Sequence, residues 1–188
     1  MQNREIEVRF LEIDKPKLVQ RLHELGAEDL GEHLLCERIF YDSALTWMYD
    51  TIKMVRIREY DKHIFLTYKH SQTMTADGTE EIEMEINDAD KAESFLVKLG
   101  LIMYRRQEKR RRTFHLGDVI VDIDTWPNVP TYVELEGPSE QALKNAAQKL
   151  GLDWSQAVFE NARLVIEKRY NIPVSRLHSW TKNFSCRI

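Results

Sequence analysis

The stretch Glu5-Ile6-Glu7-Val8-Arg9-Phe10 decides the fold that we predict for this chain. Successive side chains of a β-strand point to opposite faces, so the charged residues of this stretch share one face and its apolar residues share the other. The same design recurs in Glu81-Ile82-Glu83-Met84-Glu85 and in Glu134-Leu135-Glu136. Three strands with acids at alternate positions call for a common explanation, and a shared charged interior that holds divalent cations provides one.

Each of these strands is followed by a predicted helix that ends at a Leu-Gly pair, which makes an internal repeat. Asp14, Asp88 and Ser139 are the predicted N-caps of the three helices. Further strands are predicted at residues 34–41, 53–59, 63–70, 104–114 and 119–124, and a fourth helix at about 156–169. A strand-rich chain with helices in its crossovers favours the α+β class with a curved or closed antiparallel sheet.

Length and composition indicate a single domain over residues 1–170, followed by a tail at 171–188 whose structure the sequence does not predict. The net charge of −4 argues against a nucleic-acid partner, and no apolar run approaches the length that spans a membrane. Cys36 and Cys186 form no CxxC motif and are interpreted as reduced thiols. We therefore expect a cytoplasmic protein, and the sequence leaves open whether two copies form a homodimer.

Charge on alternate strand positions has an ordinary explanation, because most such faces are simply exposed to water. Two observations favour an interior face instead: the pattern recurs on about seven predicted strands, and Arg-x-Arg pairs accompany the Glu-x-Glu pairs. Carboxylates suit the hard cations Mg²⁺ and Mn²⁺, whereas the planar fork of arginine matches phosphate oxygens. Together the two sets describe the site of a metal–triphosphate complex.

At this point the chain resembles the CYTH family, the triphosphate tunnel metalloenzymes. Glu5-Ile6-Glu7-Val8-Arg9 resembles the family's opening Glu-x-Glu-x-Lys, with arginine in place of the final lysine. Other motifs resemble those of the family in the same order: Arg56-Ile57-Arg58, Thr67-Tyr68-Lys69, Glu81-Ile82-Glu83, Lys109 to Phe114, and Asp124 with Glu134 and Glu136. The resemblance covers residues 5–136, and it implies a closed or nearly closed eight-stranded antiparallel β-barrel with helices packed outside.

The resemblance also implies a role for each matched residue. The predicted catalytic residues are Glu5, Glu7 and Arg9, although an arginine keeps its charge and cannot act as the general base that a lysine could be. The predicted ligands of Mg²⁺ or Mn²⁺ are Glu5, Glu7, Asp122, Asp124, Glu134 and Glu136. The predicted triphosphate-binding residues are Arg56, Arg58, Lys69, Lys109 and Arg111, with Arg38 as a further candidate and with Glu81 and Glu83 facing the tunnel.

Three functions are compatible with these residues. The first is a metal-dependent enzyme of the class IV adenylyl cyclase type, which converts ATP to cyclic AMP and pyrophosphate. The second uses the same tunnel to hydrolyse thiamine triphosphate or inorganic tripolyphosphate. The third is a module that binds polyphosphate or a nucleotide without turnover. The expected partner is a small-molecule triphosphate, namely ATP, thiamine triphosphate or tripolyphosphate, and neither a nucleic acid nor a membrane.

Overall fold

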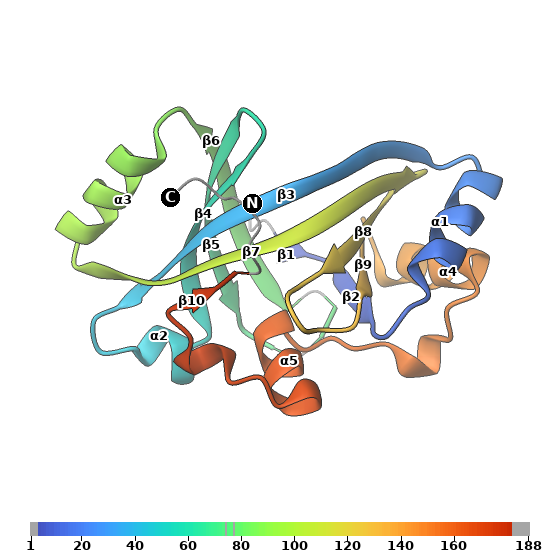
Figure 1. The fold of residues 1–188 in the computed structure, drawn as a ribbon. Helices are drawn as coiled ribbons and strands as arrows, with labels where there is room; N and C mark the ends of the chain where they lie inside the picture. Colours follow the sequence, from blue (N-terminus) through green and yellow to red (C-terminus); the bar gives the residue numbers. More distant parts are fainter. Residues whose placement is uncertain (1–3, 74, 77, 182–188) are drawn as a thin grey trace.

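The computed structural model describes residues 4–73, 75–76 and 78–181, with the backbone alone for Arg4 and Glu5. Its main feature is one strongly curved sheet with helices on the outside (Figure 1). The strands follow each other in the order β1-β6-β5-β4-β3-β7-β8-β9-β2, and all neighbours in this path are antiparallel. The expected α+β antiparallel barrel is thereby confirmed.

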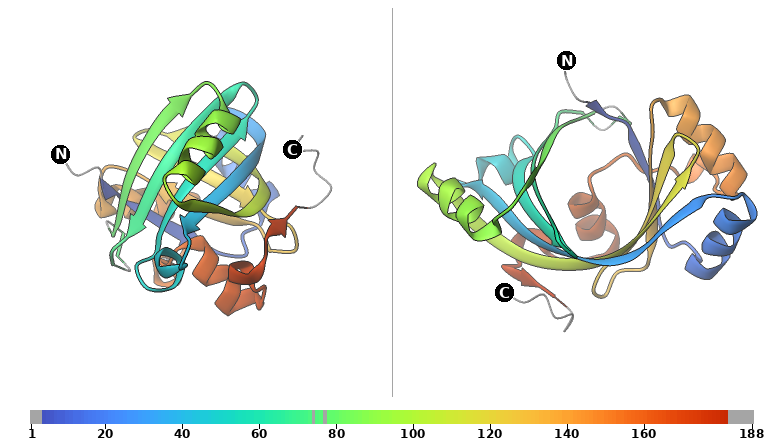
Figure 2. Two further views of the ribbon diagram at one scale, coloured as in Figure 1. Left: turned by 90° about the vertical axis from the view of Figure 1, so that its left-hand side faces the viewer. Right: turned by 90° about the horizontal axis from the view of Figure 1, so that it is seen from above.

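The N-terminal segment closes the sheet, because it pairs with both of its ends. Its first part, β1 (Arg4–Glu5), pairs with β6, and its second part, β2 (Glu7–Phe10), pairs with β9. Seen from above in the right-hand view of Figure 2, the strands surround a central space. The segment from which the prediction began is therefore the one that joins the two edges of the sheet.

The other strands are longer than β1 and β2, and two of them run the length of the molecule. Their bounds are β3 (Glu28–Asp42), β4 (Lys53–Tyr60), β5 (His63–Ser71), β6 (Thr79–Ile86), β7 (Leu101–Leu116), β8 (Val119–Thr125) and β9 (Tyr132–Glu136). The two long strands, β3 and β7, pair from Glu28↔His115 to Asp42↔Leu101. A short strand, β10 (Ser179–Trp180), lies parallel to β7.

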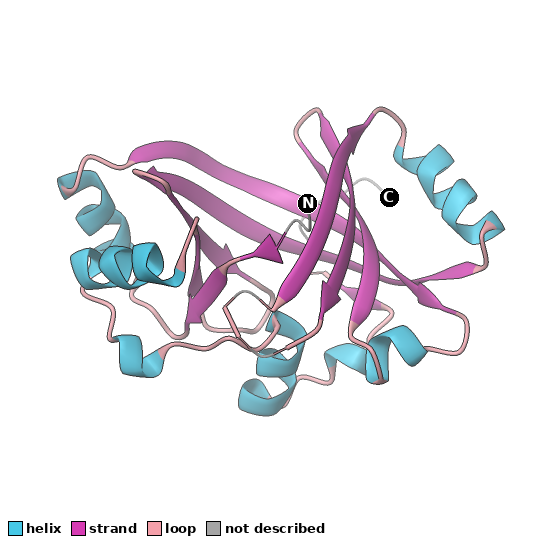
Figure 3. Cartoon of the chain, turned by 180° about the vertical axis from the view of Figure 1, so that it is seen from behind, coloured by secondary structure: helices cyan, strands magenta, loops and turns pink. Residues whose placement is uncertain are grey.

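Helices α1 (Lys15–Glu24), α3 (Ala89–Lys98) and α4 (Glu140–Leu150) lie on the outer face of the sheet, as the view from behind in Figure 3 shows. Helices α2 (Thr46–Tyr49) and α5 (Ala162–Tyr170) lie below the barrel in the view of Figure 1. The 3₁₀ turns are η1 (Trp154–Gln156) and η2 (Val174–Arg176). The predicted caps form: the side chains of Asp14, Asp88 and Ser139 accept from backbone N–H groups of the first turn. Gly151 ends α4 with φ 73°, a left-handed conformation that glycine adopts without strain.

Two apolar clusters lie between the sheet and helices α1, α3 and α4, on the side away from the barrel interior, and two others include residues that line the interior. Val8, Val121 and Leu135 project outward from β2, β8 and β9 and pack against α1 and α4 through Leu22 and Leu143. A second cluster joins the outer face of β3 and β4 to α3. Because the apolar faces are used on the outside, the charged faces of the same strands must point inward.

Two expectations need correction. The fourth helix is displaced to Ala162–Tyr170, with η1 before it. Cys36 is bonded in a disulfide, which contradicts the interpretation as a reduced thiol; the other cysteine, Cys186, lies outside the described residues. Within the described chain no helix combines the length and the hydropathy needed to cross a membrane.

Candidate functional site

The inward face of the barrel encloses a cavity of about 350 Å³. This volume lies within the usual range for pockets that bind small organic ligands. Charged side chains from β2, β3, β4, β5, β6, β7, β8 and β9 line it, and α5 contributes Ala162, Arg163 and Ile166, with its N-cap residue Asn161 beside them. In Figure 1 α5 lies below the barrel, and in the view from above it falls within the outline of the strands, so α5 covers one end of the cavity.

One wall of the cavity carries most of its basic groups. Arg56 and Arg58 project from β4, Lys69 from β5, and Lys109 and Arg111 from β7. Cross-strand pairing places Arg56 opposite Thr67, and its guanidinium donates to the Thr67 hydroxyl at 3.3 Å. Alternate positions on neighbouring strands thus bring five cations to one interior surface, which is the arrangement that a chain of phosphates requires.

Glu37 on β3 organises two of these arginines. Its Oε1 accepts from Arg58 Nε at 2.8 Å and lies 3.7 Å from Arg56 Nη1. Its Oε2 accepts from the Gln107 amide at 2.6 Å, and Gln107 Oε1 in turn accepts from Arg105 Nε at 2.7 Å. All of these side chains are buried or nearly so. A fixed carboxylate therefore holds the guanidinium groups of Arg56 and Arg58 in place.

The adjoining wall, made by β8, β9 and β2, carries further acids. Glu134 Oε1 contacts Arg9 Nη2, and Glu134 Oε2 accepts from Arg111 Nη2 at 2.9 Å. Asp124 is fully buried, and it accepts from Lys109 Nζ at 2.6 Å and from Arg111 Nε and Nη2 at 2.7 Å each. Every one of these acids is thus paired with a base of the same cavity.

These pairs change the pKa values in the directions that their charges require. Burial opposes the charged form of Glu134, but Arg9 and Arg111 hold its pKa well below the usual value. The pKa of Asp124 is lowered as well, because Arg111 and Lys109 outweigh the cost of its burial. Burial and the neighbouring Arg111 lower the pKa of Lys109 to about 8, although Asp124 acts in the opposite direction. Asp124 and Glu134 are therefore ionised at neutral pH.

The structure brings together most of the residues predicted for the site. The predicted residues that line the cavity are Glu7, Arg9, Arg56, Arg58, Lys69, Glu81, Glu83, Lys109, Arg111, Asp122, Glu134 and Glu136. Asp124 lies directly behind Lys109 and Arg111. Of Glu5 only the backbone is described, and it belongs to β1.

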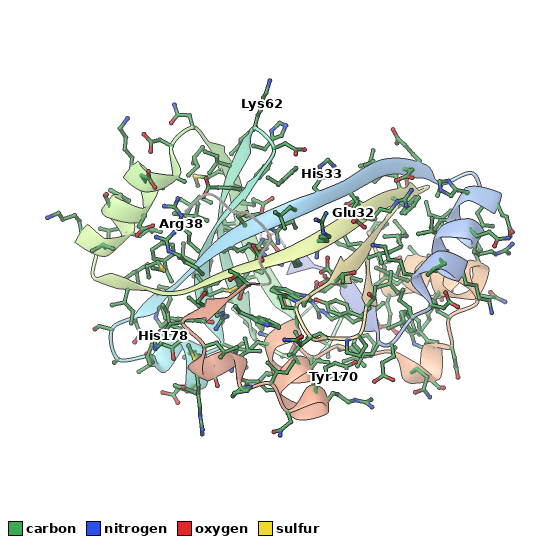
Figure 4. All side chains as sticks on the ribbon, viewed as in Figure 1. Glu32, His33, Arg38, Lys62, Tyr170 and His178 are labelled. Carbon is green, nitrogen blue, oxygen red and sulfur yellow. The ribbon has the colours of Figure 1, made fainter. Side chains whose placement is uncertain are left out.

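Arg38 does not line the cavity. Its guanidinium lies on the outer side of β3, where it donates to Asp90 and Glu93 of α3 and to Glu59 of β4 (Figure 4). The residue before it, Glu37, faces inward in its place. We therefore do not assign Arg38 to the candidate site.

Sequence reasoning missed Glu37, the Gln107–Arg105 pair and an apolar end of the cavity. That end is lined by Ile39, Tyr41, Trp47, Met48, Ile52 and Met54. The register supplies the missing information, because Glu37 pairs directly with Arg58 on β4 and with Gln107 on β7. A pairing register between distant strands cannot be read from the residues of one strand alone.

The acids of β2, β8 and β9 are the described groups whose oxygens suit a metal ion. Within the described ranges, no three or more His, Cys, Asp or Glu side chains are grouped so that they could hold a metal. The reason is visible in the ion pairs, since Arg9 and Arg111 draw the carboxylates toward themselves. The donors are of the right chemical kind, but their present partners are arginines.

Comparison with known proteins identifies the family to which the chain belongs. A candidate adenylate cyclase of Methanocaldococcus jannaschii is 29% identical over 133 residues, which cover 70% of this chain and 75% of that protein. The solved structure of a candidate adenylate cyclase from Vibrio parahaemolyticus shares the fold with a TM-score of 0.74 at 17% identity, over 89% of this chain and 99% of that one.

A second solved structure, from Hippeastrum, is described as a candidate adenylyl cyclase with a dominant triphosphatase activity. It matches with a TM-score of 0.62 at 16% identity, over 94% of this chain and 97% of that one. The family model of the CYTH domain matches residues 3–160, which include strands β1 to β9. With the curled antiparallel sheet and its charged interior, this match shows that the chain belongs to the CYTH domain family.

Proposed function

We propose that this chain is a divalent-metal-dependent enzyme that acts on a triphosphate in the barrel interior, with ATP as substrate and a cyclase-type reaction. The observation that carries the proposal is the convergence of five bases, Arg56, Arg58, Lys69, Lys109 and Arg111, on one cavity that also holds the acids of β9. Such a site neutralises a chain of phosphates, and charge neutralisation and positioning supply most of the catalysis in phosphoryl chemistry.

The chemistry of the donor set fits the metal that the family implies. Carboxylate oxygens are the preferred ligands of Mg²⁺ and Mn²⁺. On the side chains described, Asp122, Glu134 and Glu136 would hold the ion, with Glu7 and Asp124 as neighbours and Glu5 as a proposed further ligand. A bound ion supplies a Lewis acid that lowers the charge on phosphate oxygens.

Each of the bases would contribute differently to binding the phosphates. Arg56 and Arg58 are kept in position by Glu37, and Arg111 is kept in position by Asp122 and Asp124, so these guanidinium groups need little reorganisation when a phosphate arrives. Lys69 projects from β5, and its Nζ lies 2.5 Å from Glu81 Oε2. Arg9 is a permanent cation whose pKa is raised, so it orients anions and takes no proton from a nucleophile.

The apolar end of the cavity favours a substrate that carries an organic group. Trp47, Met48 and Met54 line the cavity and belong to one apolar cluster. An inorganic polyphosphate offers nothing to pack against such side chains, whereas a nucleobase has both an apolar face and polar edges. This observation favours a nucleoside triphosphate.

Hydrolysis of a triphosphate is the second candidate. The Hippeastrum protein, whose fold this chain shares over most of its length, is described as having a dominant triphosphatase activity. The same bases and acids would serve a reaction in which water, instead of the ribose hydroxyl, attacks phosphorus.

Product analysis separates the two reactions. The purified chain is incubated with Mg²⁺ or Mn²⁺ and, in separate reactions, with ATP, thiamine triphosphate and tripolyphosphate. We expect cyclic AMP and pyrophosphate from ATP; release of orthophosphate would favour hydrolysis, and tight binding without any product would leave only a binding module.

A pair of neighbouring arginines on β7 provides a matched control. Arg111→Gln changes the cavity and should abolish turnover, whereas Arg112→Gln changes a side chain that pairs with Asp29 on the outside and should leave turnover as it is. Equal effects of the two substitutions would contradict a reaction inside the barrel.

A further inference from the structure

The guanidinium of Arg9 occupies a position between two carboxylates of the acidic wall. Its Nη2 lies 2.8 Å from Glu7 Oε1 and also contacts Glu134 Oε1. Its Nη1 donates to the backbone carbonyl of Glu160 at 2.9 Å, and the backbone of Arg9 forms an isolated bridge with Val158. The side chain is buried, so strand β2 and the segment at 158–160 fix the guanidinium in this place.

A cation held in this way competes with a metal ion for the same oxygens. Glu134 is the acid most affected, because Oε1 faces Arg9 while Oε2 accepts from Arg111 at 2.9 Å. Like charges repel strongly at contact distance in a buried site, so a divalent ion beside Glu7 and Glu134 would face a fixed positive charge. The lysine that the family motif has at this position offers a single nitrogen, whereas Arg9 contacts both carboxylates through Nη2 and also donates to the Glu160 carbonyl through Nη1, which anchors the charge.

The balance of charge at this wall indicates how many ions it takes. The acids here are Glu7, Asp122, Asp124, Glu134 and Glu136, and the bases are Arg9, Lys109 and Arg111. These five negative and three positive charges leave an excess of two negative charges among the named groups, which one divalent ion balances. A second divalent ion would make the wall net positive before any phosphate is bound.

We propose that Arg9 is a built-in cation that takes the place of a divalent ion between Glu7 and Glu134, so that the chain binds one divalent ion, at the acids of β8 and β9. The inference rests on the proposed function only in that these acids hold a metal at all. It makes Arg9 the residue that sets the number of ions and the affinity for them, whichever triphosphate reaction the chain performs.

Titration with Mn²⁺ alone tests the inference without any turnover. Free Mn²⁺ is followed by electron paramagnetic resonance at increasing metal concentration, for the full chain and for Arg9→Gln. We expect one ion per wild-type chain, and for Arg9→Gln either a second ion or an affinity tighter by on the order of tenfold, because a buried unit charge at contact distance has been removed.

The control is Arg58→Gln, because Arg58 is also an interior arginine paired with an acid but contacts Glu37 and not the acids of β2 and β9. It should leave Mn²⁺ binding at the wild-type level. Arg9→Lys serves if the glutamine variant does not fold, with a smaller gain in the same direction. Two ions per wild-type chain, or no gain in any folded Arg9 variant, would overturn the inference; a complete absence of Mn²⁺ binding would overturn the metal part of the proposed function with it.

Discussion

Replacement of Asp124 by asparagine should destabilise the protein strongly. Asp124 is fully buried, and its carboxylate accepts three short hydrogen bonds from two cations, Lys109 and Arg111, at 2.6–2.7 Å. Asparagine has nearly the same shape but no charge, so the variant leaves two buried cations without their shared counter-ion. Removal of one partner of a buried ion pair costs about 3–5 kcal/mol of unfolding free energy.

This loss would be a large share of the total, because domains of this size are stable by only about 5–15 kcal/mol. A destabilisation of that size lowers Tm by roughly 6–20 °C in a chain of this length. Urea unfolding and differential scanning fluorimetry measure the two quantities. Asp118→Asn is the control, because Asp118 lies exposed in the turn before β8 and should change neither.

Tripolyphosphate adds a second measurement on the same variant. An anion that binds the native cavity should raise the Tm of Asp124→Asn by more than it raises that of the wild type, since its negative charge replaces the counter-ion that Lys109 and Arg111 have lost. A loss below about 1 kcal/mol, which is typical of an exposed ion pair, would refute the reasoning that these charges are buried and mutually dependent.

Three further outcomes are expected. Arg56→Ala should raise KM for the triphosphate in steady-state kinetics and leave Mn²⁺ affinity unchanged, because Arg56 contacts Glu37, Glu81 and Glu83 and none of the acids of β9; an unchanged KM would contradict its role. Glu134→Gln should abolish turnover and weaken Mn²⁺ binding while circular dichroism still shows the fold, and full activity would exclude Glu134 as a ligand. Stability should fall on acidification: the lowered pKa values of Asp124 and Glu134 contribute stability above the unfolded carboxylate values of about 4, and this is lost as pH falls toward the folded values, so a Tm that stays constant from about pH 7 to about pH 3 would contradict the buried ion pairs.

The sequence allowed the barrel and most of its interior to be predicted, because the two-residue alternation of charged and apolar side chains determines both the outer and the inner face of a strand. In β2 and in residues 133–136 of β9 the charged and apolar residues alternate throughout, so the assignment of one face to the core assigns the other face to the cavity. The helices were predictable for a different reason: Asp14, Asp88 and Ser139 are caps whose signals are local.

Strand β3 shows where this reasoning ends. Around Glu37 and Arg38 the residues are apolar on both faces, since Leu35 and Ile39 lie on one face and Phe40 lies on the other, and all three are buried. Alternation therefore carried no information about which charge points inward, and the expectation of a phosphate-binding site favoured Arg38. The register of β3 with β4 and with the distant strand β7 places Glu37 beside Arg58 and Gln107, and it is therefore Glu37 that faces inward.

The contacts of Arg9 could not be foreseen for a related reason. Its motif was visible, but the position of its guanidinium depends on Glu134 of β9 and on the carbonyl of Glu160, which are distant in sequence. The apolar end of the cavity was missed because Trp47 and Met48 belong to α2, a short helix without a side-chain cap.

A crystal structure of the chain with tripolyphosphate and Mn²⁺ tests the central claim most directly. We predict that the phosphates lie inside the barrel, in contact with Arg56, Arg58, Lys69, Lys109 and Arg111, and that the ion lies at the acids of β8 and β9. Phosphates bound only on the outer surface, with the interior ion pairs left as they are, would contradict the account.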